Sequence, residues 1–371
     1  MDKTIPATDE LRRQFAALDK KVFAHVGDNA RGAQLAVHAD GAVFHGSAGF
    51  AEARRHKGKM LYGIDLELYA TDRFPQTERL FEESERDAIN AQIESGAAFL
   101  IAPSRFPSSA RDTASIKSLL KEGRRFVAAA QEDNPPLPAV VPIVVRFDEL
   151  EDRRWVAPVQ GSGLPIATVF AAYGDPLSTP AQLEGAIELI QAASVACVLR
   201  CDTSAIGLMA VGAVAGAIGT SSAVRHLWLP SRRSDKRSSV PRIFVPRFAN
   251  WMKEPFIQLA AADPRLDDLF RCDCSVCGHE GDVRALTHPS VKPQRQDEHS
   301  IAAAVKLAHR VLRAKDPEME WVKTCNEALN AYDKLDRVGI EGPAKPGALE
   351  AWISVLGSVP APATSQMPSL R

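Results

Sequence analysis

Three closely spaced cysteines are the residues of this chain best suited to binding a metal. Cys272, Cys274 and Cys277 form a C-x-C-x-x-C cluster within the segment RCDCSVCG. Thiolates at this spacing can converge on a tetrahedral Zn²⁺, which binds cysteine sulfur at about 2.3 Å. In a chain without secretory features, clustered cysteines favour metal binding over disulfides. We therefore predict a zinc site that one further ligand completes.

The fourth ligand is expected among the histidines that follow the cysteines: His279, His288, His299 and His309. His279 comes only two residues after Cys277 and would strain a closed tetrahedron. His299 opens a helix predicted over 300–314, and a ligand in the first turn of a helix is rigidly aimed. We therefore predict His299 as the fourth ligand. Four protein ligands close a zinc site, so this zinc is expected to be structural rather than catalytic.

Four acidic residues lie in or just after predicted strands: Asp65, Glu67, Asp175 and Asp202. Barrel enzymes place catalytic groups at the carboxyl ends of their strands, so we predict Asp202 and Asp65 as catalytic carboxylates. His226 is the third catalytic candidate, because an imidazole can assist proton transfer. Asp175 and Arg200 are expected to bind substrate. Arg200 has the same strand parity as Asp202, and the two are expected to pair at the barrel mouth.

Four of these residues also have a purely structural interpretation. Asp202 lies where the N-cap of a helix is expected, and Asp175 precedes a proline in a typical turn. Asp65 can serve as the partner of an internal cation. His226 can be a hydrogen-bonded core histidine. The sequence leaves both interpretations open for all four.

Predicted strands and helices alternate through the middle of the chain. Strands are predicted over 60–69, 97–102, 140–147, 165–172, 195–200, 217–219, 226–229 and 242–245, and helices over 78–95, 115–131, 179–193 and 204–215. This alternation predicts an α/β fold with a parallel sheet. Roughly eight strands between residues 60 and 246 favour a (β/α)₈ TIM-type barrel. An open nucleotide-binding sheet fits less well, because no glycine-rich phosphate turn follows the first strand.

The chain divides into three predicted regions. Residues 1–59 are expected to form an N-terminal helix and a hairpin, because 34–45 alternates around Asp40-Gly41. Residues 60–248 are expected to be the barrel core. Residues 249–371 combine cysteines, histidines and charged helices, and we predict a C-terminal zinc-binding helical insertion there. Cys197, Cys201 and Cys325 lie in other predicted elements and are expected to be core residues.

The composition excludes several classes of protein. Of the 371 residues, 45% are hydrophobic and 25% are charged, which is typical of a globular protein and excludes wholesale disorder. The 45 Lys and Arg nearly balance the 46 Asp and Glu, so bulk positive charge cannot drive nucleic-acid binding. No targeting peptide is predicted, and the longest apolar stretch, 205–218, is too short to cross a bilayer. We expect a cytoplasmic protein without membrane contact.

One segment departs from this charge balance. Residues 225–247 contain seven Lys and Arg against one acid, a local charge of +6. Trp228 and Phe244 lie among these basic residues. We expect the segment to contact the phosphate backbone of a nucleic acid while a flipped base enters the barrel. The residues expected to make these contacts are Arg232, Arg233, Lys236 and Arg237. A solvated loop is the structural alternative.

The cysteine cluster and helix-borne histidine, at the end of a predicted barrel, resemble the zinc site of the tRNA-guanine transglycosylase family. Cys277 precedes His299 by 22 residues, and the family's histidine follows its cysteines by a little over twenty. The family's nucleophile loop, Asp-x-x-Met-Pro-Thr-Arg, is similar to residues 226–232, which read His-Leu-Trp-Leu-Pro-Ser-Arg. The resemblance covers 226–310 by motif and 60–246 by architecture.

This resemblance implies an enzyme that exchanges guanine in tRNA or DNA for a 7-deazaguanine-type base. In the family an aspartate attacks the anomeric carbon of the ribose, and a second aspartate handles protons. This chain departs from that pattern at two points. His226 stands at the nucleophile position, and no segment resembles the family's Asp-Ser-Gly-Gly-Phe-Gln base-binding motif. The resemblance also implies a homo- or heterodimer.

The sequence supports three functional hypotheses. The first is a transglycosylase-like pentosyltransferase that exchanges or modifies a guanine-type base in tRNA or DNA, with Asp202 as the replacement nucleophile. The second is a catalytically inactive paralogue that binds nucleic acid or a partner subunit. The third is an unrelated barrel enzyme that acts on a phosphorylated small molecule, with residues 219–222 as its phosphate-binding turn.

Overall fold

Parallel strands form a nearly closed barrel in the computed structural model, which describes residues 6–26, 30–70, 85–105, 113–133, 135–229, 240–279, 281–340 and 342–357. Within these residues the strand order is β3-β2-β1-β8-β7-β6-β5-β4. The barrel strands are β1 (Lys21–Val26), β2 (Gly41–His45), β3 (Leu61–Asp65), β4 (Leu100–Ile101), β5 (Ala139–Arg146), β6 (Pro165–Ala172), β7 (Val195–Cys201) and β8 (Ala215–Gly219). Ala98, just before β4, donates its N–H to the carbonyl of Tyr62 on β3 at 2.8 Å. The predicted TIM-type barrel is confirmed.

The predicted hairpin over 34–45 is wrong. Helix α2 (Ala30–Leu35) precedes Asp40-Gly41, and β2 then pairs in parallel with β1, with Gly41 opposite Phe23. Asp40 accepts a hydrogen bond from the backbone N–H of Val22 at 2.8 Å, so it supports the start of β1. The barrel therefore begins at Lys21, and the predicted boundary at residues 59 and 60 falls between two of its strands.

Two predicted strands do not belong to the ring of eight. β9 (Leu227–Trp228) pairs only with the end of β6, at Ala171 and Ala172. β10 (Arg242–Val245) pairs antiparallel with β11 (Asn250–Lys253) in a separate two-stranded sheet. The ring has eight strands, close to the predicted number, but β1 and β2 complete it in place of these two later segments.

Alternate residues along the barrel strands belong to two different cores. The outward-facing residues, such as Val22 and Ala24 of β1, pack under the surrounding helices. The inward-facing residues fill the barrel and include Phe23, Val43, Phe99, Val140, Val169, Leu199 and Ala217. Leu11 of α1 (Thr8–Gln14) and Phe15 and Leu18 of η1 (Phe15–Leu18) join this inner core. At the carboxyl end of the strands, beyond this inner core, the inward-facing side chains are polar.

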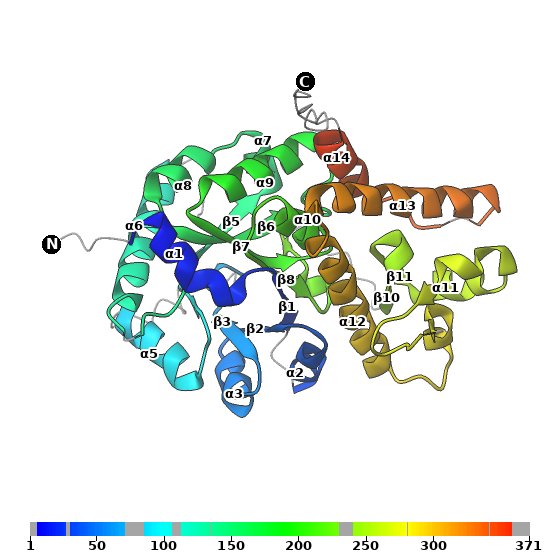
Figure 1. Cartoon of the computed structure of the whole chain (residues 1–371), viewed down its shortest axis with the longest axis horizontal. Helices are drawn as coiled ribbons and strands as arrows, with labels where there is room; N and C mark the ends of the chain where they lie inside the picture. Colours follow the sequence, from blue (N-terminus) through cyan, green and yellow to red (C-terminus); the bar gives the residue numbers. More distant parts are fainter. Residues whose placement is uncertain are drawn as a thin grey trace, which may run out of the picture.

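Helices surround the barrel on its outside (Figure 1). They are α2, α3 (Ala48–Arg55), α5 (Glu85–Ser95), α6 (Thr113–Ala130), α7 (Phe147–Glu151), α8 (Val156–Ser162), α9 (Pro180–Ala192) and α10 (Ser204–Ala210). Local sequence explains the start of α9, where Thr179 and Gln182 form a capping box and Pro180 occupies the first turn. In the part of the chain described here, no helix has the length and apolar character needed to cross a membrane.

The C-terminal elements pack against one side of the barrel (Figure 1). They are α11 (Glu254–Ala261), β12 (Arg271–Cys272), β13 (Gly281–Asp282), α12 (Pro293–Leu312), α13 (Pro317–Arg337) and α14 (Gly347–Leu356). The small-residue helix α10 allows this close approach. A Cβ at Gly207 would lie 2.3 Å from Nε1 of Trp321 and 2.5 Å from the ring of Trp352. Glycine at this position therefore lets α13 and α14 dock on the barrel.

Candidate functional site

The three cysteines and His299 converge in one cluster, as the sequence predicts. Their ligand atoms all lie within 4.8 Å of one another. Nδ1 of His299 is 3.0 Å from Sγ of Cys277 and 3.4 Å from Sγ of Cys274. Cys272 comes from β12, the next two cysteines come from the β12–β13 connection, and His299 projects from α12. Two elements thus contribute ligand atoms to one point, which is the arrangement of a metal centre.

The local fold of the hairpin explains how the cysteines reach this point. β12 and β13 pair antiparallel, with Cys272 opposite Gly281. A Cβ at Gly281 would lie 2.2 Å from Cβ of Cys277 and 2.5 Å from the carbonyl oxygen of Cys272, so only glycine fits. Lys306 of α12 donates to the carbonyl of Asp273 at 2.8 Å, and Arg295 donates to the carbonyl of Val276 at 3.0 Å. These bonds fasten the cysteine loop to the helix that carries His299.

The second nitrogen of His299 fits a metal ligand. Nε2 lies 2.8 Å from the carbonyl oxygen of Phe244 on β10, and the side chain is fully buried. A histidine that ligates a metal typically donates its other ring N–H to a carbonyl or carboxylate, which fixes the tautomer and leaves the first nitrogen free to bind. The structure does not use the other predicted candidates in this way. His288 is exposed and contacts Ser290, and His309 contacts Asp40.

A second polar cluster lies at the carboxyl-terminal mouth of the barrel. Its members are His25 of β1, His45 at the end of β2, Asp65 at the end of β3, Glu67 just after β3, and Arg200 of β7. We call these five residues the mouth cluster. His25, His45 and Asp65 share the inward parity of their strands. Of the predicted catalytic residues, only Asp65 belongs to this cluster.

A β-bulge turns Arg200 into the barrel. β7 pairs with β8 through Val198 opposite Gly216 and then through Cys201 opposite Ile218, so one extra residue is inserted in β7. Leu199 already faces the inner core and Cys201 packs in the outer core. The extra residue is Arg200, whose backbone adopts a left-handed conformation with φ of 46°. Bulges of this kind re-aim a side chain, often beside an active site.

Arg200 pairs with Glu67, so the predicted pairing of Arg200 with Asp202 is wrong. Nη1 of Arg200 binds the Glu67 carboxylate, and Nη2 donates to the carbonyl of Ala223 at 2.7 Å. Nδ1 of His45 binds the second carboxylate oxygen of Glu67. Burial alone raises the pKa of Glu67, but the imidazoles of His25 and His45 and the charge of Arg200 bring it well below its usual range. Glu67 is therefore ionised at neutral pH.

Asp65 is the most deeply buried acid of the mouth cluster, with 1% of its surface exposed. One carboxylate oxygen accepts a hydrogen bond from the backbone N–H of Glu67 at 3.0 Å, and the other accepts from the hydroxyl of Tyr69. Burial, and then the charge of Glu67, raise the pKa of Asp65. Both carboxylate oxygens of Asp65 are hydrogen-bonded and almost none of its surface is exposed. Asp65 therefore helps to hold the backbone of Glu67 in place.

The other two predicted acids form a second pair after neighbouring strands. Asp175 follows β6 and Asp202 follows β7. Burial, followed by the charge of Asp202, raises the pKa of Asp175 to about 6. Asp202 accepts from the backbone N–H of Ser204 at 2.8 Å, so it also supports the start of α10. Asp175 accepts from the backbone N–H of Leu177 at 3.0 Å. Each acid therefore has the capping or turn role that its sequence position allows, and this role does not prevent it from also taking part in a reaction.

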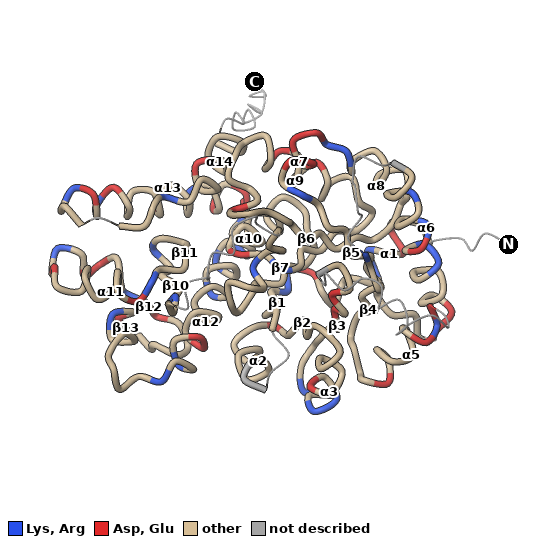
Figure 2. The backbone as a smooth tube through the Cα atoms, turned by 180° about the vertical axis from the view of Figure 1, so that it is seen from behind, with Lys and Arg blue, Asp and Glu red and all other residues tan. Residues whose placement is uncertain are grey.

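The remaining predicted residues lie elsewhere. His226 is buried between η5 (Ser222–Val224) and β9, and its ring packs against Trp228 in a tilted arrangement with centroids 4.1 Å apart. Nearby, the guanidinium of Arg225 lies 3.8 Å from the ring centroid of Trp251. The predicted nucleic-acid contacts lie outside the described residues: Arg232, Arg233, Lys236 and Arg237. Both charge signs are spread over the barrel helices and the C-terminal elements (Figure 2).

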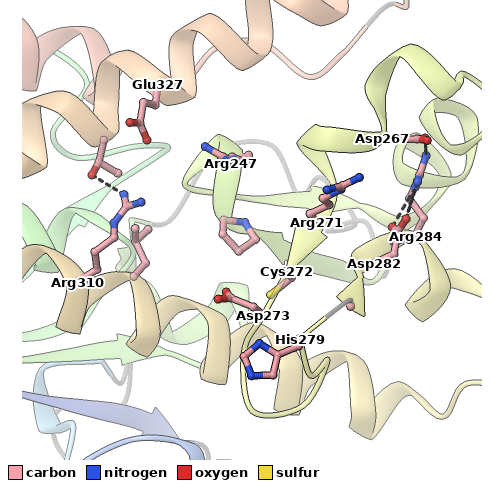
Figure 3. Close-up of a pocket in the computed structure, with 14 residues that line it drawn as sticks. Arg247, Asp267, Arg271, Cys272, Asp273, His279, Asp282, Arg284, Arg310 and Glu327 are labelled. Carbon is pink, nitrogen blue, oxygen red and sulfur yellow. Dashed lines mark hydrogen bonds and ion pairs between the residues drawn. The ribbon is translucent and has the colours of Figure 1, made fainter.

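A cavity of about 670 Å³ lies beside the cysteine cluster rather than at the barrel mouth (Figure 3). Arg247, Arg271 and Arg310 line it together with Asp273 and Glu327. Arg310 donates to the hydroxyl of Thr324 at 2.9 Å. The lining thus mixes both charge signs, and its basic residues do not form an isolated anion site.

Sequence reasoning missed His25 and His45. The signal was present in KVFAHV and GAVFH, two short apolar runs that each place a single histidine near the end. Both segments had been assigned to an N-terminal helix, loop and hairpin, which removed them from the barrel. No protein-family model matches this chain, and no curated protein matches it. The site therefore rests on its own geometry.

Proposed function

We propose that the chain breaks the N-glycosidic bond of a guanine-type base in tRNA or DNA and exchanges or modifies that base at the barrel mouth. The observation that carries the proposal is the group of carboxylates gathered at the strand ends of a barrel to which a Cys₃His module is fixed. Carboxylates suit this reaction because its transition state resembles an oxocarbenium ion. A negative oxygen can stabilise that charge or bond to the anomeric carbon.

Asp202 takes the reacting position in this proposal, and Asp175 lies beside it. Asp202 follows β7 at the carboxyl end of the barrel, where barrel enzymes hold their catalytic groups. Asp175 carries a raised pKa of about 6 beside it. An acid with a raised pKa can keep its proton and donate a hydrogen bond to the substrate beside a nucleophilic carboxylate. We assign Asp202 as the nucleophile and Asp175 as a substrate-binding acid.

The metal in the Cys₃His cluster is, in this proposal, Zn²⁺. Three thiolates and one imidazole are a donor set that zinc prefers, and the hairpin-plus-helix arrangement supplies all four positions of a tetrahedron. Because protein atoms occupy every position, the metal would hold the β12–β13 hairpin on α12 and take no part in the reaction. One zinc ion per chain is expected.

A binding function without catalysis is the second candidate. One observation favours it: the residue at the position of the family nucleophile is His226, which is 8% exposed and packs against Trp228. An imidazole packed in this way offers no carboxylate to the anomeric carbon. A chain of this kind would bind nucleic acid or a partner subunit through the face that carries the barrel mouth.

The test is base exchange with radiolabelled guanine, and with a labelled 7-deazaguanine, on mixed tRNA and on duplex DNA. We expect the parent to incorporate label and Asp202→Asn to lose about 10²–10⁴-fold in rate. Asp148→Asn is a matched control, because Asp148 is a half-exposed acid in the first turn of α7, just after β5, and pairs with Arg146. An inactive parent that still binds nucleic acid would support the second candidate. An active Asp202→Asn variant would remove Asp202 from its assigned role.

A further inference from the structure

The hydrogen bonds of the mouth cluster determine which ring nitrogens carry protons. Nδ1 of His25 accepts a hydrogen bond from the backbone N–H of Arg200 at 3.2 Å. In a neutral imidazole the proton must then sit on Nε2. Nε2 of His25 is fully buried, has no hydrogen-bond partner among the described residues, and faces Oε1 of Glu67 at 3.7 Å. His25 therefore points an N–H, not a lone pair, at Glu67.

This tautomer separates the mouth cluster from a metal centre. The ligand atoms of His25, His45 and Glu67 are close enough to surround an ion. A metal-bound histidine, however, uses the lone pair of one nitrogen and donates the proton of the other. His299 meets this requirement through the carbonyl of Phe244, whereas His25 would need Nδ1 to donate to another N–H. Arg200 also already places a positive charge on Glu67. The cluster is built to hold protons.

Glu67 orients His45. The carboxylate binds Nδ1 of His45, so Nδ1 carries a proton and Nε2 is the nitrogen that can gain or lose one. The His45 side chain keeps 19% of its surface exposed, and among the described residues no hydrogen bond to its Nε2 is found. A largely buried carboxylate on one nitrogen, with the other nitrogen open, is the arrangement that makes histidine a general acid and base.

The groups that face His45 set its charge. Glu67 and Asp65 are the neighbouring acids, Arg200 is the neighbouring cation, and the His25 ring lies with its centroid 6.0 Å away. Burial lowers the pKa of His45, but the bond to Glu67 and the charges of Glu67 and Asp65 together raise it by more. The pKa of His45 is therefore above its usual value. Burial lowers the pKa of His25, so that ring stays neutral beside it.

Two of the five described non-glycine residues with positive φ form this ion pair. Glu67 and Arg200 both adopt left-handed backbone conformations, with φ of 51° and 46°. For residues with a side chain this conformation costs roughly 1–2 kcal/mol each. The bulge in β7 and the turn after β3 thus bring two strained residues into contact from opposite sides of the mouth. Strain that is kept at a buried ion pair commonly marks a functional site.

We propose that His45 is the proton-transferring residue of the barrel mouth, with Glu67 as its positioning residue and with Arg200 and His25 holding Glu67 in place. This inference rests on the proposed function for the identity of the reaction. When the bond from C1′ to the base nitrogen breaks, its electron pair goes to the nitrogen, which takes the proton from Nε2 of His45. The Asp202 oxygen forms the new bond to C1′. In the return step the incoming base loses its N–H proton to Nε2 of His45, attacks C1′ and releases Asp202.

The experiment combines histidine NMR with the base-exchange assay on the full chain. In ¹⁵N-histidine-labelled protein we expect His45 to carry its proton on Nδ1 and His25 to carry its proton on Nε2. Glu67→Gln should lower the proton affinity of His45 at least about tenfold, because it removes an opposite charge in contact. Glu52→Gln is the control, since Glu52 forms an equivalent pair with His56 at 3.2 Å on α3. It should leave His45 unchanged.

In the activity arm, His45→Gln should reduce exchange about 10²–10⁴-fold. Glu67→Gln should move the pH profile in the direction in which it moves the titration of His45, and Glu67→Asp should restore part of it. An active parent whose His45→Gln variant keeps the rate and the pH profile overturns the inference and leaves the proposed function standing. An inactive parent refutes the proposed function, and the NMR tautomers then decide the inference. A second metal ion per chain that is lost in Glu67→Gln also overturns it.

Discussion

Replacing His299 by alanine tests the metal centre most directly. Structural zinc sites bind the ion with roughly 10–16 kcal/mol, so one ligand of four accounts for roughly 2.5–4 kcal/mol. At about 1.4 kcal/mol for each factor of ten, His299→Ala should weaken zinc binding about 10²–10³-fold. His299 is also fully buried and contacts the Phe244 carbonyl, so the variant leaves a cavity between α12 and β10. The metal and the packing should therefore be lost together.

Zinc competition against a chromophoric chelator measures the affinity, and metal analysis after dialysis measures the content. Trp251 serves as a local reporter, because its ring centroid lies 4.8 Å from that of Phe244. We expect its fluorescence to change on zinc removal in the parent and to resemble the zinc-free form in His299→Ala. His288→Ala is the control, since His288 is exposed and its side chain hydrogen-bonds only with Ser290 among the described residues. Parental zinc affinity in His299→Ala, or zinc loss in His288→Ala, would refute the ligand assignment.

Three further changes test other parts of the molecule. Gly281→Ala should lower the free energy of unfolding by about 1–3 kcal/mol, because its Cβ would lie 2.2 Å from Cβ of Cys277; an unchanged urea midpoint would contradict this. Burial alone raises the pKa of Asp40, but bonds from His309 and the Val22 amide lower it overall. The ionised carboxylate therefore stabilises the folded protein at any pH above the pKa of Asp in the unfolded chain. Asp40→Asn should therefore cost about 1 kcal/mol at pH 7 in urea unfolding, and the difference from the parent should disappear as the pH falls through the folded-state pKa of Asp40; a difference that persists in acid would contradict this. Simultaneous alanine replacement in the basic segment should weaken nucleic-acid binding and reduce its salt dependence, and parental binding would remove the claim for Arg232, Arg233, Lys236 and Arg237.

The metal centre was predictable because its information is local. Cys272, Cys274 and Cys277 lie within six residues, and the zinc geometry then requires one further donor on a nearby element. The helix predicted over 300–314 placed His299 at a helix start; α12 instead begins at Pro293, so His299 is its seventh residue and the helix fixes its direction. The barrel was predictable for a similar reason, since alternating apolar strands and helices occur along the chain itself.

The mouth cluster was not predictable, because its members meet only when the barrel closes. His25 and Arg200 are 175 residues apart in the sequence, and Arg200 and Glu67 are 133 apart. Strand parity alone pointed Arg200 toward Asp202, and the extra residue in β7 reversed that direction. Asp40-Gly41 shows that local sequence can mislead in the same way. The pair is typical of a hairpin turn, but here it ends the connection between the parallel strands β1 and β2.

Helix α12 links the Cys₃His cluster to the amino end of β1. His299 near its start faces the cysteines, and His309, ten residues or about 15 Å further along the helix, contacts Asp40 at 2.8 Å. The same Asp40 oxygen accepts the N–H of Val22 at the start of β1, the strand that carries His25. A metal bound at one end of α12 therefore fixes a helix whose other end supports β1. A metal bound by the Cys₃His cluster would thus help, through α12 and β1, to position His25, which faces Glu67.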